Sequence, residues 1–597
     1  MNFSGDLQEC LAKNVDYCYA FLTMIQFQRE AAQILTRLLT ETGLTEDQIF
    51  QLLEKPKVQS HGDLAFPCFQ AAKFFKKPPN VLAQELSEKL QASGLKSFSW
   101  AKPSGPYINF SLSPDTAFSI AESVFIKKEK FGQMNWGQGK KILVEYSSPN
   151  VAKELHIGHF RNTILGQSLV NIYKAAGYHT IALNHLGDWG SQFGRVAYGY
   201  LKWGKEEDLK IDPLQYLMSL YVKVNAAEET DPSIDREARL LFRKIETGDP
   251  ELTALWKKFC TLSIEGLQKI YQRLGVQFDH VIGESFYVDK IPALLDSLRA
   301  KNLLQESAGA QVVFLGDDIP PCLILTGDGT TLYGTRDIAA AIWRQKEFSF
   351  DQNLYVVGSE QQLHFKQVFG VLKLMGFSWS EQLQHVAYGL YRFKDGKFST
   401  RKGKIILAEE VLNEARDKAI ELIEKKNPNL KDKQAVAEMV GVGAVIFNDL
   451  STDRQKDVEF DWEKILDFDG DTGPYLQYTY ARASSILRNA EAKGFLPQLP
   501  KNSSVLRESE ATLTLLKTFG YLEASILGAV RLNKPSIIAN YAIDLAKAFN
   551  GFYREVRVLE EQAGAAEVSE RLGVVQAFRQ VLANTLTLLC MKAPTEM

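Results

Sequence analysis

The chain has 597 residues, of which 45% are hydrophobic and 24% are charged, so it can bury several cores and we expect about three or four domains. The formal net charge of −3 excludes no class of partner, because nucleic-acid binding needs only a local basic face. The six cysteines lie far apart without a Cys-x-x-Cys pair. This spacing argues against zinc and against a disulfide framework, and it fits a reducing cytoplasm.

Residues 1–135 are predicted to form a mixed α+β domain. Amphipathic stretches at 27–40 and 80–92 predict helices, a turn is expected at 61–67, and residues 105–110 end a strand-like segment. The apolar stretch 19–22 is too short to span a bilayer and follows acidic residues, so we expect a buried helix and no membrane association.

The most informative segment is the tetrapeptide at 156–159. An alternating apolar run at 141–146 predicts a strand before it, and residues 160–176 predict a helix directly after it. A helix N-terminus concentrates unpaired N–H groups and binds phosphate. Gly158 lets a nucleotide approach the backbone, while His156 and His159 can donate to phosphoryl oxygens during nucleophilic attack. This two-histidine turn predicts an adenylating enzyme.

Alternating strands and helices from 139 to 275 predict a parallel, doubly wound sheet. A second strand at 179–183 runs into the turn 184–190, at the carboxyl edge where such sheets bind ligands. His185 in this turn is either a packed core histidine or a ligand-facing one. The densely charged helical segment 208–258 interrupts the alternation and is expected to be a surface insertion.

Further strands are expected at 311–315, 354–357 and 385–388, completing the nucleotide fold. If a helix starts at Tyr333, then Tyr333 and Asp337 lie one turn apart on the same face. The plain alternative for Asp337 is a structural ion pair with Arg336 or Arg344.

Five cations lie between Lys394 and Lys404, interleaved with small residues. This basic loop (residues 394–404) suits a mobile segment that closes over a triphosphate, although a solvated basic turn has the same composition. Beyond residue 407 the pattern is almost entirely helical and typical of a bundle, with residues 496–501 as the most linker-like stretch. Three tyrosines and an arginine at 475–482 suit stacking on splayed-out bases, or else packing in a core.

The segment 144–159 resembles the signature of class I aminoacyl-tRNA synthetases, and specifically of the arginyl-tRNA synthetases. The resemblance extends to 184–190, 328–337, 358–364, the basic loop and the helical C-terminus. Within the basic loop, Thr400 stands where the family pattern of this class has its second lysine. Arginyl enzymes that lack this lysine carry one before the two-histidine turn, and Lys153 occupies that place.

The resemblance implies roles for individual residues. Catalytic roles fall to Lys153, His156, Gly158, His159, Lys397, Ser399, Arg401 and Lys402. ATP contacts fall to His156, His159, His185, Gly187, Asp188, His364 and Gly389. A guanidinium needs a carboxylate and an aromatic face, and arginine contacts fall to Glu145, Asn150, Tyr333, Asp337 and Gln361. Contacts with tRNA fall to Tyr107, Asn109, Phe110, Tyr475, Gln477, Tyr478 and Arg482, with core packing as the alternative.

The implied fold is a class I synthetase Rossmann-type nucleotide-binding core with an α+β N-terminal domain and an all-α C-terminal bundle. The expected domains are 1–135, a catalytic domain at 136–405 with the insertion at about 205–260, a helical connection at 406–470, and an anticodon-binding domain at 471–597. The implied reaction ligates L-arginine to its tRNA through an adenylate, with ATP as substrate, Mg²⁺ on its phosphates and no dedicated metal site.

The implied enzyme is a cytoplasmic monomer. Two alternatives remain at this point: another class I adenylate-forming enzyme, and a non-catalytic tRNA-binding relative of a synthetase.

Overall fold

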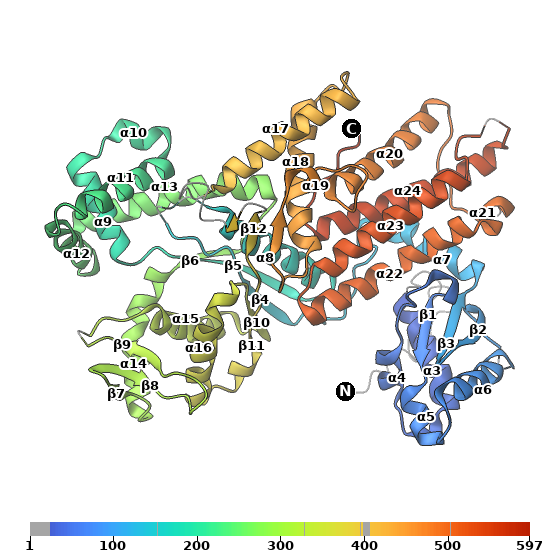
Figure 1. The fold of residues 1–597 in the computed structure, drawn as a ribbon, viewed down its shortest axis with the longest axis horizontal. Helices are drawn as coiled ribbons and strands as arrows, with labels where there is room; N and C mark the ends of the chain where they lie inside the picture. The colour runs from blue at the N-terminus through green and yellow to red at the C-terminus, as the bar shows by residue number, and fades with distance from the viewer. Residues whose placement is uncertain are drawn as a thin grey trace.

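The computed structural model describes residues 24–597 except 93, 152, 154, 328, 394–395, 398–405, 502 and 561, and it describes only the backbone at 59, 393, 396 and 397. Figure 1 shows a helical insertion at one end of the molecule, a parallel sheet near the middle, and a helical bundle that extends to the other end. The N-terminal domain lies beside this bundle, where α7 (Pro114–Lys127) and α3 (Met24–Leu38) pack on α22 (Glu510–Leu532).

The N-terminal domain is built on a three-stranded antiparallel sheet in the order β1-β3-β2. Both predicted helices are present, as α3 and α6, whereas residues 64–67 form a strand and Gly105, with a φ of +55°, makes the turn between β2 and β3. The strands are β1 (Leu64–Pro67), β2 (Phe98–Ser104) and β3 (Tyr107–Leu112). The helices are α3 (Met24–Leu38), α4 (Glu46–Leu52), α5 (Phe69–Phe75), α6 (Pro79–Ala92) and α7 (Pro114–Lys127), with short 3-10 turns at Thr40–Thr42, Gln59–His61 and Lys128–Lys130.

A five-stranded parallel sheet in the order β11-β10-β4-β5-β6 forms the centre of the molecule. Its alternate side chains enter two different cores: Ile142 and Val144 pack on one face, and Leu143 packs on the other. Burial on both faces explains why the three central residues of β4 are all apolar. The strands are β4 (Lys141–Glu145), β5 (His179–Leu186), β6 (His280–Gly283), β10 (Gln352–Tyr355) and β11 (Leu383–His385).

One strand prediction needs correction. The expected strand at 311–315 is β8 (Ala310–Val313), which belongs to a separate antiparallel sheet with β7 (Gln305–Ser307) and β9 (Cys322–Leu325). Its place in the nucleotide sheet is taken by β6, a strand of only four residues, which is too short for its pattern to predict a strand. The helices of this half are α14 (Ile291–Ala300), α15 (Tyr333–Phe348) and α16 (Gln362–Leu374), with 3-10 segments at Glu284–Lys290, Ser359–Gln361 and Ser378–Gln382.

Helices also make up the predicted charged insertion. They follow α8 (Ile157–Ala175), which packs on β4 and β5, and they form the group of helices at one end of Figure 1. These helices are α9 (Ser191–Trp203), α10 (Glu206–Ile211), α11 (Pro213–Glu228), α12 (Ser233–Glu246) and α13 (Pro250–Leu274).

The last third is the predicted helical bundle. A small sheet in the order β13-β12-β14 joins it to the preceding residues, with β14 lying between α18 and α19. By length and composition α22 could cross a membrane, but Leu515, Phe519 and Leu522 are buried against the rest of the bundle, as in a core helix. The strands are β12 (Tyr391–Phe393), β13 (Gly396–Lys397) and β14 (Val458–Phe460). The helices are α17 (Ala408–Lys426), α18 (Lys433–Ser451), α19 (Trp462–Ile465), α20 (Gly473–Ala492), α21 (Ser504–Glu508), α22 (Glu510–Leu532), α23 (Ser536–Glu555) and α24 (Ala565–Leu588).

Candidate active site

The two-histidine turn caps the N-terminus of α8, as the strand-turn-helix context predicts. Nδ1 of His156 accepts a hydrogen bond from the N–H of Gly158 at 3.0 Å, and Nδ1 of His159 accepts one from the N–H of His156 at 3.4 Å. The two imidazole rings lie 3.8 Å apart. A Cβ at Gly158 would lie 2.8 Å from the ring of His156, so glycine is required for this close turn.

Both imidazoles are neutral in this environment. Burial lowers the pKa of His159 to about 3, with further contributions from His156 and Lys153, and burial followed by Lys153 lowers the pKa of His156. A neutral imidazole whose Nδ1 accepts a hydrogen bond carries its hydrogen on Nε2. Each ring therefore offers one N–H donor from the start of the helix, where the dipole also favours an anion.

The residues that follow the basic loop are bonded to this turn and to Leu155 before it. The N–H of Ile157 donates to the carbonyl of Ile406 at 3.2 Å, and the N–H of Ala408 donates to the carbonyl of Leu155 at 2.8 Å. Lys397 lies in β13, which pairs with β12. The remaining predicted catalytic residues of the loop, Ser399, Arg401 and Lys402, lie outside the described residues.

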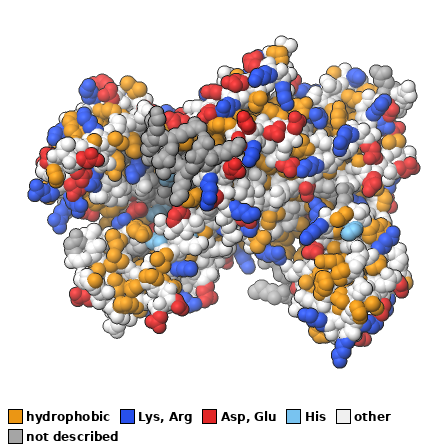
Figure 2. Space-filling view, viewed as in Figure 1, with side chains coloured by type: hydrophobic (Ala, Val, Ile, Leu, Met, Phe, Trp, Pro, Cys, Tyr) orange, Lys and Arg blue, Asp and Glu red, His pale blue; other side chains and the backbone are white. Residues whose placement is uncertain are grey.

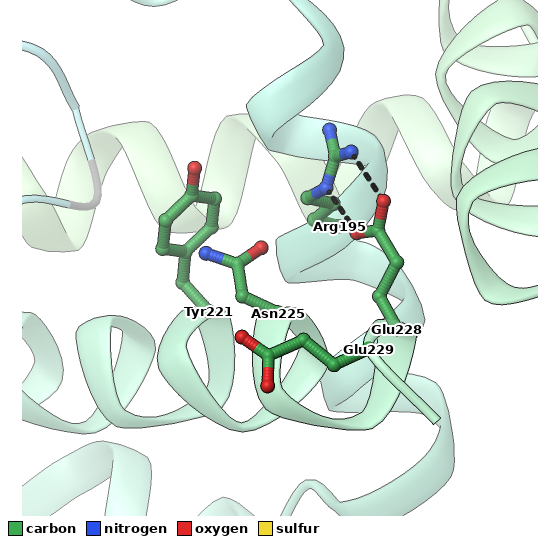
Figure 3. Close-up of a pocket in the computed structure, with 5 residues that line it drawn as sticks. All are labelled: Arg195, Tyr221, Asn225, Glu228 and Glu229. Atoms are coloured by element: carbon green, nitrogen blue, oxygen red, sulfur yellow. Dashed lines mark hydrogen bonds and ion pairs between the residues drawn. The ribbon is translucent and has the colours of Figure 1, made fainter. Parts of the chain in front are cut away.

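Lys153 faces the helical insertion. Its ammonium lies 5.4 Å from the centre of the Tyr221 ring on α11. Tyr221 lines an open polar hollow of about 550 Å³ in the insertion, together with Asn225, Glu229 and an ion pair between Arg195 and Glu228 (Figure 3). The insertion thus contributes an aromatic side chain next to the lysine that precedes the two-histidine turn.

Asp337 is the meeting point of three segments. The helix α15 begins at Tyr333, as predicted. Asp337 accepts a hydrogen bond from Nε2 of His364 at 2.7 Å, and its other carboxylate oxygen lies 3.7 Å from Nε2 of His185. The Tyr333 ring lies 4.7 Å from the His364 ring. Burial would raise the pKa of Asp337, but the hydrogen bond and charge of His364, with His185 and Arg344, lower it below its usual range.

The alternative partners of Asp337 are engaged elsewhere. Arg336 donates to Glu284 at 2.7 Å, and Arg344 forms a buried ion pair with Glu145. Glu145 therefore has an internal guanidinium as its partner in this structure, and its expected contact with a substrate guanidinium stays a prediction. The long-range contact between β4 and α15 decides this, and nothing in the local sequence reveals it.

Glu284 is an acidic residue that sequence reasoning missed. It follows β6 at the carboxyl edge of the sheet, and burial raises its pKa despite the opposing charges of Arg336 and His185. The charge of Asp337 also raises the pKa of Glu284, so the two carboxylates lie within electrostatic range. The four-residue strand before it carried too weak a signal to place it.

The remaining nucleotide and arginine candidates fall into two groups. Asn150 forms an isolated β-bridge with Gly187, and a Cβ at Gly187 would lie only 2.3 Å from the Asn150 amide oxygen. Gln361 is exposed just before α16. In contrast, the Asp188 carboxylate accepts hydrogen bonds from the backbone and the hydroxyl of Ser285, and Gly389 has both backbone polar groups engaged. The polar groups with which Asp188 and Gly389 are expected to contact ATP therefore already form hydrogen bonds within the fold.

The predicted tRNA contacts in the N-terminal domain differ in exposure. Phe110 is fully buried against Phe98 and Asn109 is buried, so the core alternative holds for both, while Tyr107 is half-buried beside Phe69. Phe69 and Phe74 are exposed, and Figure 2 shows hydrophobic side chains gathered on this domain.

In the C-terminal bundle, Gln477 is fully buried and donates to the carbonyls of Met439 and Lys592, so it is a core residue. Tyr475, Tyr478 and Arg482 remain partly exposed. The Arg482 guanidinium lies 4.9 Å from the Tyr478 ring and 5.7 Å from the Tyr553 ring. Their side chains form an aromatic and cationic patch on α20 and α23.

Three family models match successive parts of the chain. They describe the arginyl-tRNA synthetase N-terminal domain (residues 27–112), the catalytic domain of class I tRNA synthetases for arginine (121–462) and the DALR anticodon-binding domain (476–597). The chain is 43% identical to an arginine–tRNA ligase of Alkaliphilus metalliredigens, over 96% of this chain and 100% of that protein. Identity is 44% to an arginine–tRNA ligase of Clostridium perfringens, over 93% of this chain and 97% of that protein.

Solved structures give the same result. The Thermus thermophilus arginyl-tRNA synthetase superposes with a TM-score of 0.79 at 26% identity, covering 96% of this chain and 100% of that one. The family models, the identity and the fold agree over nearly the whole chain, and this protein belongs to the arginyl-tRNA synthetases, the class I ligases that charge tRNA with arginine.

Proposed function

We propose that the carboxyl edge of the parallel sheet, which carries the two-histidine turn and the segments around Asp337, is where this enzyme forms arginyl-adenylate and then transfers arginine to tRNA. The observation that carries this assignment is the convergence at one sheet edge. The strands β4, β5, β6 and β10 are parallel. His185 lies at the carboxyl end of β5, and the two-histidine turn, Glu284 and the segment before His364 follow the carboxyl ends of β4, β6 and β10.

Arginine is bound at Asp337 in this proposal. The carboxylate is ionised, it lies one turn from Tyr333, and both of its imidazole partners can yield to a guanidinium fork. The buried Nδ1 of His185 has no hydrogen-bond partner among the described residues, as expected for a group whose partner is a substrate. Asn150 and Gln361 hold the α-amino and carboxyl end.

ATP is bound with its phosphates at the N-terminus of α8. The arginine carboxylate attacks the α-phosphate, a new P–O bond forms, and the bond to the departing pyrophosphate breaks. The Nε2–H groups of His156 and His159 donate to phosphoryl oxygens as their charge grows, and Lys153 and the basic loop neutralise the rest. No general base is needed, because the attacking carboxylate is already ionised. Magnesium enters on the triphosphate as part of the substrate.

In the second step, a ribose hydroxyl of the terminal tRNA adenosine attacks the carbonyl carbon of the mixed anhydride, and AMP leaves. The patch of Tyr478, Arg482 and Tyr553 is proposed to stack anticodon bases, and exposed aromatic residues of the N-terminal domain, with Tyr107 at their edge, to contact the body of the tRNA. We expect a cytoplasmic monomer.

The decisive experiment is arginine-dependent exchange of labelled pyrophosphate into ATP, with and without total tRNA, against a panel of other amino acids. Exchange with arginine alone among the amino acids, and a requirement for tRNA, would support the proposed pocket and a tRNA-dependent first step. Exchange with another amino acid would overturn the pocket assignment. Absence of exchange from a preparation that still binds tRNA would instead support a non-catalytic relative.

A further inference from the structure

Arg161 is a buried arginine on α8, two residues after His159, with an exposed fraction of 1%. Its guanidinium reaches three backbone carbonyls in two other segments. Nη1 donates to the carbonyl of Gly389 at 2.7 Å and to that of Lys456 at 2.9 Å, and Nη2 donates to the carbonyl of Arg454 at 3.2 Å. A rigid planar fork is suited to hold several acceptors at fixed positions.

The two segments that Arg161 holds begin the strands β12 and β14. Gly389 lies two residues before β12, and Lys456 lies two residues before β14, which pairs with β12 in parallel. A Cβ at Gly389 would lie 2.6 Å from the carbonyl oxygen of Lys456, so the segments are packed backbone to backbone under the guanidinium. The strand β13, which includes Lys397, pairs with β12 in antiparallel.

A second buried charge completes the arrangement. Asp449 on α18 is fully buried, with one carboxylate oxygen 3.6 Å from Nε of Arg161, and the Tyr391 hydroxyl at the start of β12 donates to its other oxygen. Buried ion pairs contribute little net stability compared with apolar packing, so they are weak evidence for a purely stabilising role. This pair instead connects α8, α18 and the first residue of β12.

The two ends of the segment 389–408 are thus attached to the same turn of α8. Its far end is bonded to the two-histidine turn through Ile406 and Ala408, and its near end is held by Arg161. Adenylate formation by this chain relies on positioning and charge stabilisation, for which errors of about 1 Å reduce rates by about a hundredfold. A side chain that sets the distance between the two phosphate-binding segments therefore acts on the rate of the first step.

We propose that Arg161 is a positioning residue for adenylate formation, because it fixes the β12–β13 hairpin, which carries Lys397, relative to His156 and His159. This inference rests on the proposed role of Lys397 at the phosphates. It assigns to Arg161 no contact with substrate.

The test uses Arg161→Lys, which keeps the charge beside Asp449 and loses the fork. We expect the kcat of arginine-dependent pyrophosphate exchange, in the presence of tRNA, to fall by about tenfold or more, with the KM for arginine within about twofold of wild type. Arg571→Lys is the matched control, because Arg571 is also buried and donates to a carbonyl and to carboxylates, within the bundle. It should lower the melting temperature similarly and leave kcat unchanged.

If Arg161→Lys does not fold, Tyr391→Phe tests the same inference, because it removes only the hydroxyl that joins β12 to Asp449. A kcat per folded molecule equal to wild type in the variant that folds would overturn the inference, as would an equal loss in the Arg571 control. The variant Lys397→Ala distinguishes failure of the positioning role from failure of the proposed function. If pyrophosphate exchange by Lys397→Ala is unchanged, the role of the hairpin at the phosphates is refuted. If Lys397→Ala loses exchange but Arg161→Lys keeps a normal kcat, only the positioning role of Arg161 is refuted.

Discussion

Glu145 and Arg344 form a buried ion pair between the end of β4 and the middle of α15, with 6% and 1% of their side chains exposed. The Tyr287 hydroxyl accepts a further hydrogen bond from Nε of Arg344 at 3.3 Å. The pair engages Glu145 within the fold, whereas Asp337, on the first turns of the same helix, contacts the two histidines. The two carboxylates therefore have different internal partners, and their proposed roles can be tested separately.

Glu145→Gln should therefore act mainly on stability. The substitution leaves the Arg344 guanidinium buried without its counter-charge, which destabilises the fold by about 3–5 kcal/mol. A double variant, Glu145→Gln with Arg344→Met, should recover much of this loss, because the unpaired charge is gone. Urea unfolding of the two variants and wild type measures the effect. A single variant as stable as wild type, with a raised KM for arginine, would return Glu145 to the substrate pocket.

Asp337→Asn should raise the KM for arginine and leave the KM for ATP unchanged. The substitution removes the charge from the carboxylate proposed to accept the guanidinium fork, and loss of a charge-assisted interaction of about 1.5–3 kcal/mol corresponds to about 10- to 150-fold in affinity. Steady-state pyrophosphate exchange gives both constants. Asp351→Asn is the control, since Asp351 accepts from the N–H of Lys141 at the opposite edge of the sheet. Equal effects of both substitutions would argue against a specific pocket.

Gly187→Ala should impair catalysis through Asn150. A methyl group at this position would lie 2.3 Å from the Asn150 amide oxygen, so that side chain must move away from the turn. We expect a fall in kcat/KM for arginine of about tenfold or more, because misplacement of a substrate-positioning group reduces rates steeply. Gly551→Ala, where a Cβ meets nothing within 4 Å, provides the control for adding a methyl group. Wild-type kinetics in Gly187→Ala would remove Asn150 from the site.

Stability should fall below neutral pH through His159. Its pKa is about 3 in the folded chain against an ordinary value of 6.5, because burial disfavours the charged ring. Between these values the unfolded chain binds more protons, so the free energy of unfolding decreases as pH falls from about 6.5 towards 3. His159→Asn lacks this contribution.

The melting temperature of wild type should therefore drop more than that of His159→Asn between pH 7 and pH 5. His61→Asn, at an exposed position, controls for the loss of an imidazole as such. Parallel pH profiles for wild type and His159→Asn would show that the ring titrates normally and is not buried in solution.

Local sequence determined the central catalytic features of this protein. An alternating apolar run, two histidines around Gly158 and an amphipathic continuation specify a strand, a tight turn and a helix, and β4, the two-histidine turn and α8 follow that order. The start of α15 at Tyr333 is equally local, since neighbouring residues decide helix boundaries. The family resemblance rests on these same segments.

Only the tertiary structure decided which of the chemically equivalent side chains are free. Glu145 and Asp337 are alike as carboxylates, yet the partner that engages Glu145 lies 199 residues away. Phe110 and Gln477 are aromatic and polar candidates for RNA that the folded chain buries in its cores. The strand expected at 311–315 does not belong to the nucleotide sheet, because strand pairing depends on distant neighbours. The strand β6, which Glu284 follows, occupies that place in the sheet. Packing determines which distant residues and strands pair with one another, and a local sequence pattern contains no information about that packing.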